Sequence, residues 1–235
     1  MRLNAGCRVS RHAQRSALTP RIRPPIPGRA VRYDEHFPKN GGGRVQYVRR
    51  APAQQRNRLS NMFSLRAATP EDVDVLTDIE AKSFPPAEKA TRESFAARLA
   101  VFPDCFLILM KDGRPIGLID GMVTNNRTIT DDMFEDATLH NPNGRWQSIF
   151  GLAVLPEERH QGCASTLMRA FIEKARQEGR DGVILTCKEH LIDFYSGFGF
   201  INCGVSKSVH GGAVWYDMEL DFREERLRRE AAERD

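Results

Sequence analysis

A six-residue turn at residues 159–164, with the sequence RHQGCA, carries the clearest chemical signal in this 235-residue chain. It lies between an apolar run and an amphipathic one. Where a turn leads into a helix, unpaired backbone N–H groups and the positive end of the helix dipole point outward together, and such a turn binds phosphate groups. Gly162 lets the backbone approach an anion closely, and the small Ala164 avoids a clash in the first helical turn. Arg159 adds a positive charge that His160 could assist. The sequence therefore predicts a pyrophosphate site here.

Two other phosphate-binding motifs are absent from the sequence. There is no Gly-x-x-x-x-Gly-Lys loop and no Gly-x-Gly-x-x-Gly fingerprint. We therefore do not expect the ligand to be a nucleoside triphosphate or a dinucleotide.

The elements that position this turn follow from the spacing of apolar residues and from helix start and stop signals. A Thr-Pro pair at 69–70 starts a helix that Pro85 and Pro86 stop, and Gly179 ends the helix after the turn. We expect one mixed sheet of about six to seven strands with helices on both faces, an α/β (α+β) chain. The expected strands are 63–67, 105–110, 116–123, 147–155, 182–187, 200–205 and 214–220; the expected helices are 69–84, one from about 91, 131–137, 164–178 and 191–196.

Charge divides the chain into a basic head and an acidic body. Residues 1–60 hold 14 Lys and Arg against two Asp and Glu, a net charge of +12, so the formal net charge of +4 leaves −8 for the remainder. We expect 1–61 to be a disordered basic extension, 62–221 one domain and 222–235 a charged tail. The extension fits a nucleic-acid or membrane-surface tail, a transit peptide, or upstream translation before a natural start at Met62, which we favour.

Cysteine content and apolar run lengths limit the class of protein. The five cysteines are odd in number and include no Cys-x-x-Cys pair, which argues against a disulfide scaffold and against a zinc ribbon. We find no apolar run of the roughly 18 residues that a membrane span needs. We therefore expect a cytoplasmic protein with no metal, no membrane span and no nucleic-acid partner apart from what the basic tail could bind. Oligomeric state is open.

With these features in this order, residues 63–220 resemble the GCN5-related N-acetyltransferase (GNAT) family. In that family an Arg/Gln-x-x-Gly-x-Gly/Ala turn binds the pyrophosphate of acetyl-CoA, which here implies contacts from residues 159–164 (Arg159, His160, Gln161, Gly162, Cys163 and Ala164). The run Phe150–Val154 resembles the strand whose backbone pairs with the pantetheine arm, so that Leu152, Ala153 and Val154 are the expected contacts. The family fold splays this strand from the next, here Val183–Cys187, and the thioester lies in the opening. The segment Phe194–Phe200 resembles a further family motif.

Within the family, the resemblance is greatest to arylalkylamine N-acetyltransferases and their microbial relatives. The run Leu139–Gln147 carries it, as do Cys187–His190 and Ile79–Glu80 with Phe84. One departure concerns the general base: where the vertebrate enzymes place two histidines on the core strand, this chain has Ser148 and Phe150, so that assignment does not carry over.

The resemblance implies direct attack of an amine on acetyl-CoA in a ternary complex, with a backbone N–H near Leu152 or Val154 as the oxyanion donor. Tyr195 matches the family position that protonates the departing thiolate. Glu80 is the first candidate for the base, and Ser148 could hold a water in a relay. Glu189, His190 and bulk water are the alternatives for the base. Cys163 is either a small residue that fits the turn or a thiol whose pKa the helix terminus lowers.

The acceptor is expected to be a small primary amine, of the arylalkylamine or polyamine kind. Residues 125–146 form the acceptor loop, whose carboxylates at 131, 132, 135 and 136 either attract a cationic amine or are merely solvated. Phe134, Trp146 and Phe150 either line an apolar pocket or belong to the core. A protein lysine or N-terminal acetyltransferase is the alternative, and a loop 125–146 that closes the cleft would favour small amines. A second alternative is a non-catalytic acyl-CoA sensor.

Overall fold

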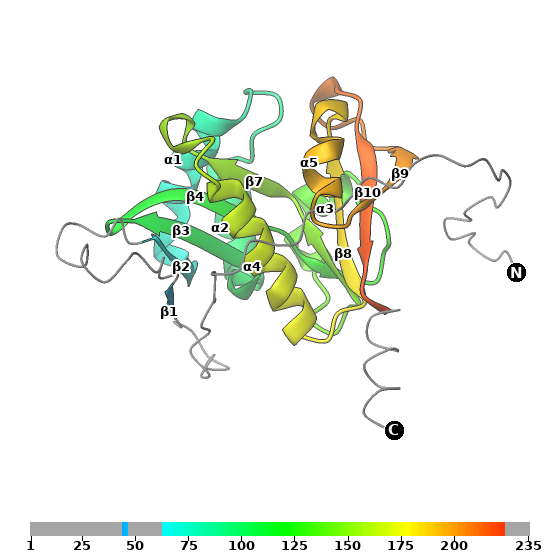
Figure 1. Ribbon diagram of the computed structural model, residues 1–235, viewed down its shortest axis with the longest axis horizontal. Coiled ribbons are helices and arrows are strands. Elements are labelled where there is room, and N and C mark those ends of the chain that lie inside the picture. The colour runs from blue at the N-terminus through cyan, green and yellow to red at the C-terminus, as the bar shows by residue number, and fades with distance from the viewer. Residues whose placement is uncertain (1–43, 47–62, 224–235) are drawn as a thin grey trace, which may run out of the picture.

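The structure, a computed structural model, describes residues 44–46 and 63–223 (Figure 1). Within the segment expected to lack regular structure, β1 (Arg44–Gln46) pairs antiparallel with β2 (Phe63–Ala67), so the expectation was wrong for these three residues. The other predictions for 1–62, and those for 224–235, lie outside the described residues. Among the described residues, no helix is both long and apolar enough to cross a membrane.

The first sheet contains five strands in the order β1-β2-β3-β4-β7. Strands β3 (Phe106–Lys111) and β4 (Arg114–Asp120) form the predicted hairpin. Its turn residues Asp112 and Gly113 have φ angles of 52° and 82°, the left-handed conformation that a two-residue hairpin turn requires. The predicted turn at 111–114 is therefore confirmed.

The second sheet also has five strands, in the order β5-β6-β8-β10-β9. Strand β8 pairs parallel with β6 on one side and antiparallel with β10 on the other. The strands of this sheet are β5 (Val123–Thr124), β6 (Trp146–Ile149), β8 (Gly182–Cys187), β9 (Ile201–Val205) and β10 (Tyr216–Asp221).

The expected single strand 147–155 is divided, and this replaces the expected single sheet with two. It breaks at Phe150 into β6 and β7 (Gly151–Val154), which belong to different sheets. The break is a β-bulge: the backbone N–H of Phe150 donates to Asp120 O at 2.7 Å, and the N–H of Gly151 bonds the Asp120 carboxylate. Two successive residues therefore face one residue of β4, and the chain turns from one sheet into the other.

The longer helices cover opposite faces of the first sheet. A Cβ on Gly117 of β4 would contact Leu167 of α4 (Cys163–Gln177), whereas Asp120, three positions later, pairs with Arg98 of α2 (Arg92–Val101). Side chains an odd number of positions apart on a strand point to opposite faces. Figure 1 shows α4 crossing in front of the strands. The predicted helices on both faces are thus confirmed.

The remaining helices are short or lie behind the sheet. Helix α1 (Val73–Ser83) follows a 3-10 turn that starts at Pro70, and Thr91 caps α2 by accepting a hydrogen bond from Ser94 N at 3.1 Å. Two further α-helices, α3 (Asp132–Glu135) and α5 (Ile192–Ser196), are a single turn or little more. The 3-10 turns are η2 (Pro70–Asp72), η3 (Pro103–Cys105), η4 (Ala137–Leu139), η5 (Pro156–Glu158), η6 (Glu189–Leu191) and η7 (His210–Gly212).

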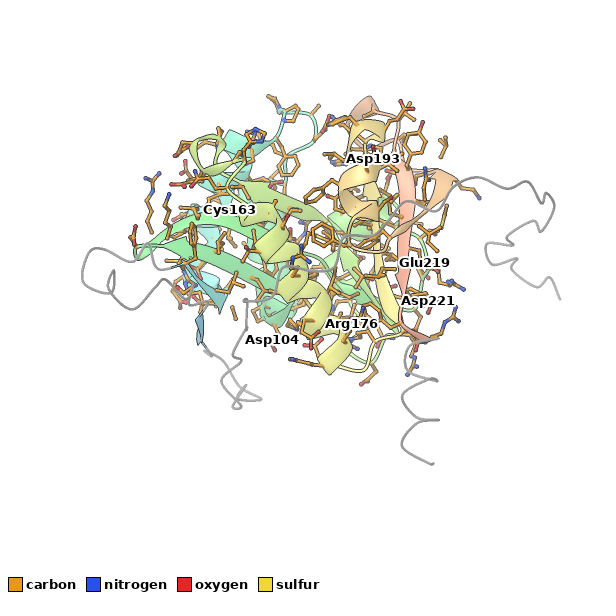
Figure 2. The ribbon with its side chains drawn as sticks, viewed as in Figure 1. Asp104, Cys163, Arg176, Asp193, Glu219 and Asp221 are labelled. Atoms are coloured by element: carbon orange, nitrogen blue, oxygen red, sulfur yellow. The ribbon has the colours of Figure 1, made fainter. Side chains whose placement is uncertain are left out.

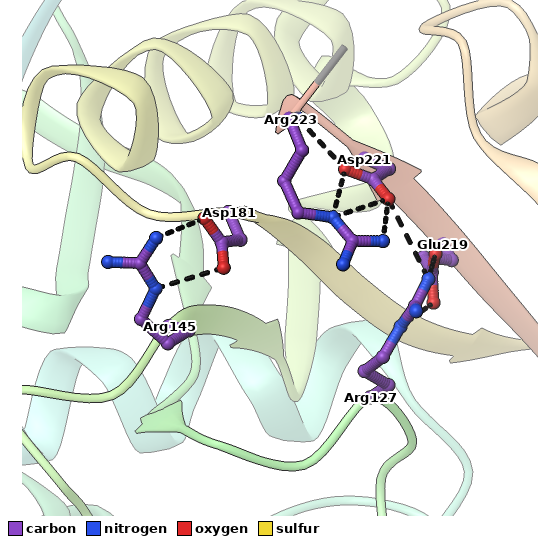
Figure 3. Close-up of polar contacts among 6 residues, drawn as sticks. All are labelled: Arg127, Arg145, Asp181, Glu219, Asp221 and Arg223. Atoms are coloured by element: carbon purple, nitrogen blue, oxygen red, sulfur yellow. Dashed lines mark hydrogen bonds and ion pairs between the residues drawn. The ribbon is translucent and has the colours of Figure 1, made fainter. Parts of the chain in front are cut away.

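Ion pairs fasten the end of the second sheet where β6 and β8 begin and β10 ends (Figure 3). Arg145 pairs with Asp181, Arg127 with Glu219 and Arg223 with Asp221. The guanidinium groups of Arg127 and Arg223 also lie 5.0 and 5.8 Å from the Trp146 ring centroid. Arg145–Asp181 joins the segments that precede β6 and β8, and Arg127–Glu219 joins the loop after β5 to β10. Beyond Leu185, at the other end of the sheet, β8 keeps β10 as its partner and loses β6.

Candidate active site

The opening between the two sheets lies beyond the point where β6 gives way to β7. Strand β8 pairs with β6 only as far as Leu185, and its last residues Thr186 and Cys187 pair with β10 alone. In the part of the chain that the structure describes, β7 pairs with β4 and with no other strand. The predicted splay between these neighbouring strands is therefore present, and Figure 1 shows β7 and β8 running apart.

Backbone groups of β7 point into this opening. Leu155 N donates to Ile116 O at 2.9 Å, so Leu155 faces β4. Alternation along a strand then turns the polar groups of Val154 and Leu152 the other way, and Val154 O indeed accepts from Ser83 Oγ at 3.3 Å rather than from β4. Leu152 and Val154, the residues named from the sequence, thus present N–H groups on the open side of β7, whereas the N–H and C=O of Ala153 face β4.

The turn at 159–164 has the shape that a phosphate site needs. Gly162 is the N-cap of α4 with φ 83°, and His160 also has a positive φ of 58°. A Cβ on Gly162 would meet no atom within 4 Å, so an anion has open access to the backbone here. The first N–H groups of a helix have no acceptor within it. Figure 2 labels Cys163 at the start of α4 and Asp193 on α5, both in the upper half of the view.

The side chains of Arg159 and Gln161 form hydrogen bonds with backbone carbonyls of the protein. Arg159 Nε donates to Val154 O at 3.1 Å and its Nη2 donates to Ser83 O at 3.3 Å. Gln161 Nε2 donates back to Glu157 O at 3.3 Å. Arg159 therefore ties the turn to the ends of β7 and α1, and the backbone of the turn supplies most of what an anion can contact.

Cys163 and Ala164 occupy the first turn of α4. The Cys163 side chain is buried in the core, and burial raises the pKa of its thiol. The alternative that the helix terminus lowers this pKa was therefore wrong: burial and the charge of Glu158 outweigh the lowering effects of Lys111 and of the Cys163 backbone. Ala164 is half-buried against the core, which agrees with a small residue that fits closely.

Tyr195 lies on α5, on the β8 side of the opening. Its ring packs edge-on against Phe194 and Phe200, with centroids 5.1 and 6.0 Å away. The side chain is 7% exposed, and burial, with a smaller contribution from neighbouring Cys187, raises its pKa well above the usual value of 10. A phenol held in this way keeps its proton at neutral pH.

Glu80 lies on α1, on the β7 side, and is 4% exposed. Its Oε1 accepts from Ala90 N at 3.0 Å, whereas its buried Oε2 has no hydrogen-bond partner. That oxygen lies 3.8 Å from the position a Cβ would take on Gly151, beside the bulge. Burial raises the pKa of Glu80 to about 7, and the charge of Asp120 adds to the rise while the Ala90 N–H and Arg98 oppose it.

Ser148 has a structural position. It is fully buried on β6, its Oγ donates to Met122 O at 2.9 Å, and it accepts from Met122 N at 3.0 Å. The donated bond and one of the accepted bonds of the hydroxyl therefore join β6 to the β4–β5 connection. Glu189 and His190, the alternatives for the base, are exposed on η6.

A wall of aromatic rings extends from the bulge outward. Phe150 and Phe134 lie 4.9 Å apart, and Phe134 stacks on His210 at 4.9 Å. All three rings are half-buried, which distinguishes them from Trp146, which is 3% exposed and belongs to the core. Sequence reasoning identified Phe134 and Phe150 but missed His210, because it lies 76 and 60 residues away from them in the chain.

Contacts between loops close the side of the opening on which these aromatic rings lie. Lys188 Nζ pairs with Glu88 Oε1 at 2.6 Å, and His210 Nε2 lies 3.1 Å from Glu88 O. The expected acceptor loop is tied down as well, because Asp131 accepts from Ser208 Oγ at 2.5 Å. Asp136 caps η4 by accepting from Thr138 N at 2.9 Å. Of the carboxylates that the sequence suggested for attracting an amine, these two serve the loops.

Comparison with known proteins agrees with this geometry. The family model described as "Acetyltransferase (GNAT) family" matches residues 73–200, more than half of the chain. A serotonin N-acetyltransferase from Mesocricetus auratus is 25% identical over 173 residues, which cover 72% of this chain and 82% of that protein.

Solved structures share the fold. The loading GNATL domain of CurA from Lyngbya majuscula superposes with a TM-score of 0.60 at 17% identity, covering 69% of this chain and 98% of that one. Ard1 from Thermoplasma volcanium gives a TM-score of 0.53 at 21% identity, covering 68% and 97%. The divided strand, the glycine turn and the family match lead to one conclusion: the chain belongs to the GNAT family and is an acetyl-CoA-dependent N-acetyltransferase.

Proposed function

We propose that this enzyme acetylates a small primary amine that carries an aromatic group, by direct attack of the amine on acetyl-CoA. The observation that carries the proposal is the buried carboxyl of Glu80, whose unpartnered Oε2 lies beside the bulge at Gly151. A buried oxygen without a partner is costly, and a substrate N–H donor would satisfy it. With a pKa of about 7, Glu80 is suited to accept a proton from an ammonium at neutral pH.

On the donor side, the turn at 159–164 holds the pyrophosphate through its backbone. Gly162 fits this role because its left-handed conformation and open Cβ position let an anion approach. The open edge of β7 aligns the thioester, and the N–H of Leu152 or Val154 stabilises the developing oxyanion. We assign to Tyr195, on the β8 side of the opening, the donation of the proton that the departing thiolate of CoA requires, because its phenol is protonated at neutral pH.

The aromatic wall and the closed loops support a small arylalkylamine over a linear polyamine or a peptide. Phe134, Phe150 and His210 form a contiguous half-buried aromatic cluster next to the bulge, and a pair of aromatic rings contributes about 0.5–1.5 kcal/mol of interaction in proteins. The contacts of Glu88 with Lys188 and His210 close the side that an extended peptide would need open. The serotonin N-acetyltransferase relative, named for an arylalkylamine, agrees with this choice.

An acetyl-transfer assay that detects free CoA tests the proposal with an arylethylamine, a linear polyamine and short peptides bearing a lysine or a free N-terminus. We expect the arylethylamine to give the highest kcat/KM. Phe134→Leu keeps an apolar side chain but loses both ring contacts, and should reduce that preference by about tenfold. Phe63→Leu on β2, outside the wall, is the matched control. A peptide that outcompetes the arylethylamine would replace the proposed acceptor with a protein substrate.

A further inference from the structure

Arg98 and Asp120 form a buried ion pair next to the proposed site, and the reaction outlined above does not use it. Arg98 is 5% exposed and Asp120 is 1% exposed, with Nη1 and Oδ2 3.0 Å apart. Removing two charges from water costs about as much as their attraction returns, so such a pair is weak evidence for stability alone. The Arg98–Asp120 pair lies between Glu80, the bulge and the aromatic wall, and this position suggests a role in the reaction.

Asp120 sets the place where the core strand leaves one sheet for the other. Its carbonyl accepts from Phe150 N and its carboxylate accepts from Gly151 N, so both N–H groups of the bulge point at this one residue. A Cβ on Gly151 would lie 2.9 Å from Asp120 Oδ1, which explains the glycine. The bulge at which β7 diverges from β8 is therefore held by both the main-chain carbonyl and the carboxylate of Asp120.

Arg98 connects the same carboxylate to the aromatic wall. Its Nη2 donates to Phe134 O at 2.9 Å, and its guanidinium carbon lies 4.8 Å from the centroid of the Phe150 ring. One planar group thus contacts Asp120, the α3 segment and the ring at the bulge. A lysine could keep the charge but could not make these contacts together, because its ammonium has no planar fork.

Both groups also act on Glu80. The Oδ1 of Asp120 and the Oε2 of Glu80 lie 2.9 and 3.8 Å from the same Cβ position on Gly151. The groups that face the Glu80 carboxyl are the Ala90 N–H from the α1–α2 loop, Arg98 from α2 and Asp120 from β4. Asp120 raises the pKa of Glu80, and Arg98 lowers it. Burial raises the pKa of Asp120 itself, against the ion pair with Arg98 and the Gly151 N–H.

We propose that Arg98 and Asp120 are positioning residues of the transferase. Asp120 fixes the bulge that aims the N–H groups of β7 at the acetyl group, and Arg98 fixes the aromatic wall that delivers the amine to Glu80. The donor and acceptor halves of the site are therefore held in register by one ion pair. This inference rests on the proposed function, and it assigns to that function two residues that touch neither substrate.

The test compares Asp120→Asn with the double variant Arg98→Met/Asp120→Asn in the full chain. Asparagine keeps the acceptor for Gly151 N, and the double variant contains no uncompensated buried charge, so it should fold. We expect kcat/KM to fall 10- to 100-fold in both variants, while calorimetric Kd values for CoA stay within threefold of wild type. Arg98→Lys should raise the KM for the amine more than its KM for acetyl-CoA.

The pH profile of kcat/KM separates positioning from stability. In Asp120→Asn the acid limb should move to lower pH, because Arg98 then acts on Glu80 unopposed, and the double variant should bring it back toward the wild-type position. A folded double variant with wild-type kcat/KM and pH profile overturns the proposal and leaves the pair a structural element. If Glu80→Gln is fully active, the assignment of Glu80 as the base is wrong, whatever the role of the ion pair. In that case the KM of Arg98→Lys for the amine tests the positioning role, and an unchanged KM overturns it.

Discussion

Replacing Glu80 with glutamine should make the protein more stable and nearly inactive. Burial raises the pKa of Glu80 from 4.5 to about 7. Between these values the folded protein holds a proton that the unfolded chain has lost, so the stability of the wild type falls as the pH rises from 4.5 to 7. At about 1.4 kcal/mol per pH unit, the cost above pH 7 is about 3 kcal/mol.

Glutamine removes this cost and retains the fold. Its side-chain oxygen can still accept from Ala90 N, which Glu80 Oε1 contacts at 3.0 Å. We therefore expect the free energy of unfolding of Glu80→Gln to exceed that of the wild type by up to about 3 kcal/mol at pH 8, and by less than about 1 kcal/mol at pH 5. Loss of a general base should reduce kcat/KM about 10²- to 10⁴-fold and remove the acid limb near pH 7.

Urea denaturation at pH 5 and pH 8, together with CoA release, measures both effects. Glu93→Gln is the matched control, because it removes one negative charge from an exposed position on α2. The reasoning is refuted if the difference in unfolding free energy between Glu80→Gln and the wild type is the same at both pH values. Stabilisation with full activity would keep the burial argument and refute only the role of the base.

Three further substitutions test other parts of the site. Gly162→Glu should weaken CoA binding more than 100-fold in calorimetry, and normal binding would move the pyrophosphate elsewhere. The left-handed backbone at φ 83° costs a glutamate about 1–2 kcal/mol, but its Cβ meets no atom within 4 Å, so the protein should remain folded. Tyr195→Phe keeps the ring contacts and should lower kcat about 10²-fold at unchanged CoA affinity; an unchanged kcat in steady-state assays would assign the acid to another group. Glu88→Gln breaks the ion pair with Lys188 and should raise the KM for the amine several-fold, whereas an equal KM would remove this loop from the acceptor site.

The sequence by itself determined the local elements, including the glycine turn that we propose for binding the donor. Helix caps at Thr69 and Thr91, the Asp112–Gly113 hairpin and the glycine turn at 159–164 depend on residues adjacent in the chain, and each lies where its pattern predicts. A left-handed glycine before an amphipathic helix is a local property. For that reason the expected phosphate site needed no knowledge of the rest of the fold.

Only the tertiary structure decided how the core strand divides and what surrounds Glu80. The bulge at Phe150 depends on Asp120, which lies 30 positions earlier in the chain. Asp120 in turn pairs with Arg98, which belongs to helix α2. No pattern along the chain marks a carboxylate that accepts from another strand. The raised pKa of Glu80 has the same origin, because desolvation depends on all atoms packed around the group and not on its neighbours in sequence. The properties of the turn at 159–164 therefore follow from residues adjacent in the chain. Those of the acceptor side arise from contacts between segments that are distant in sequence.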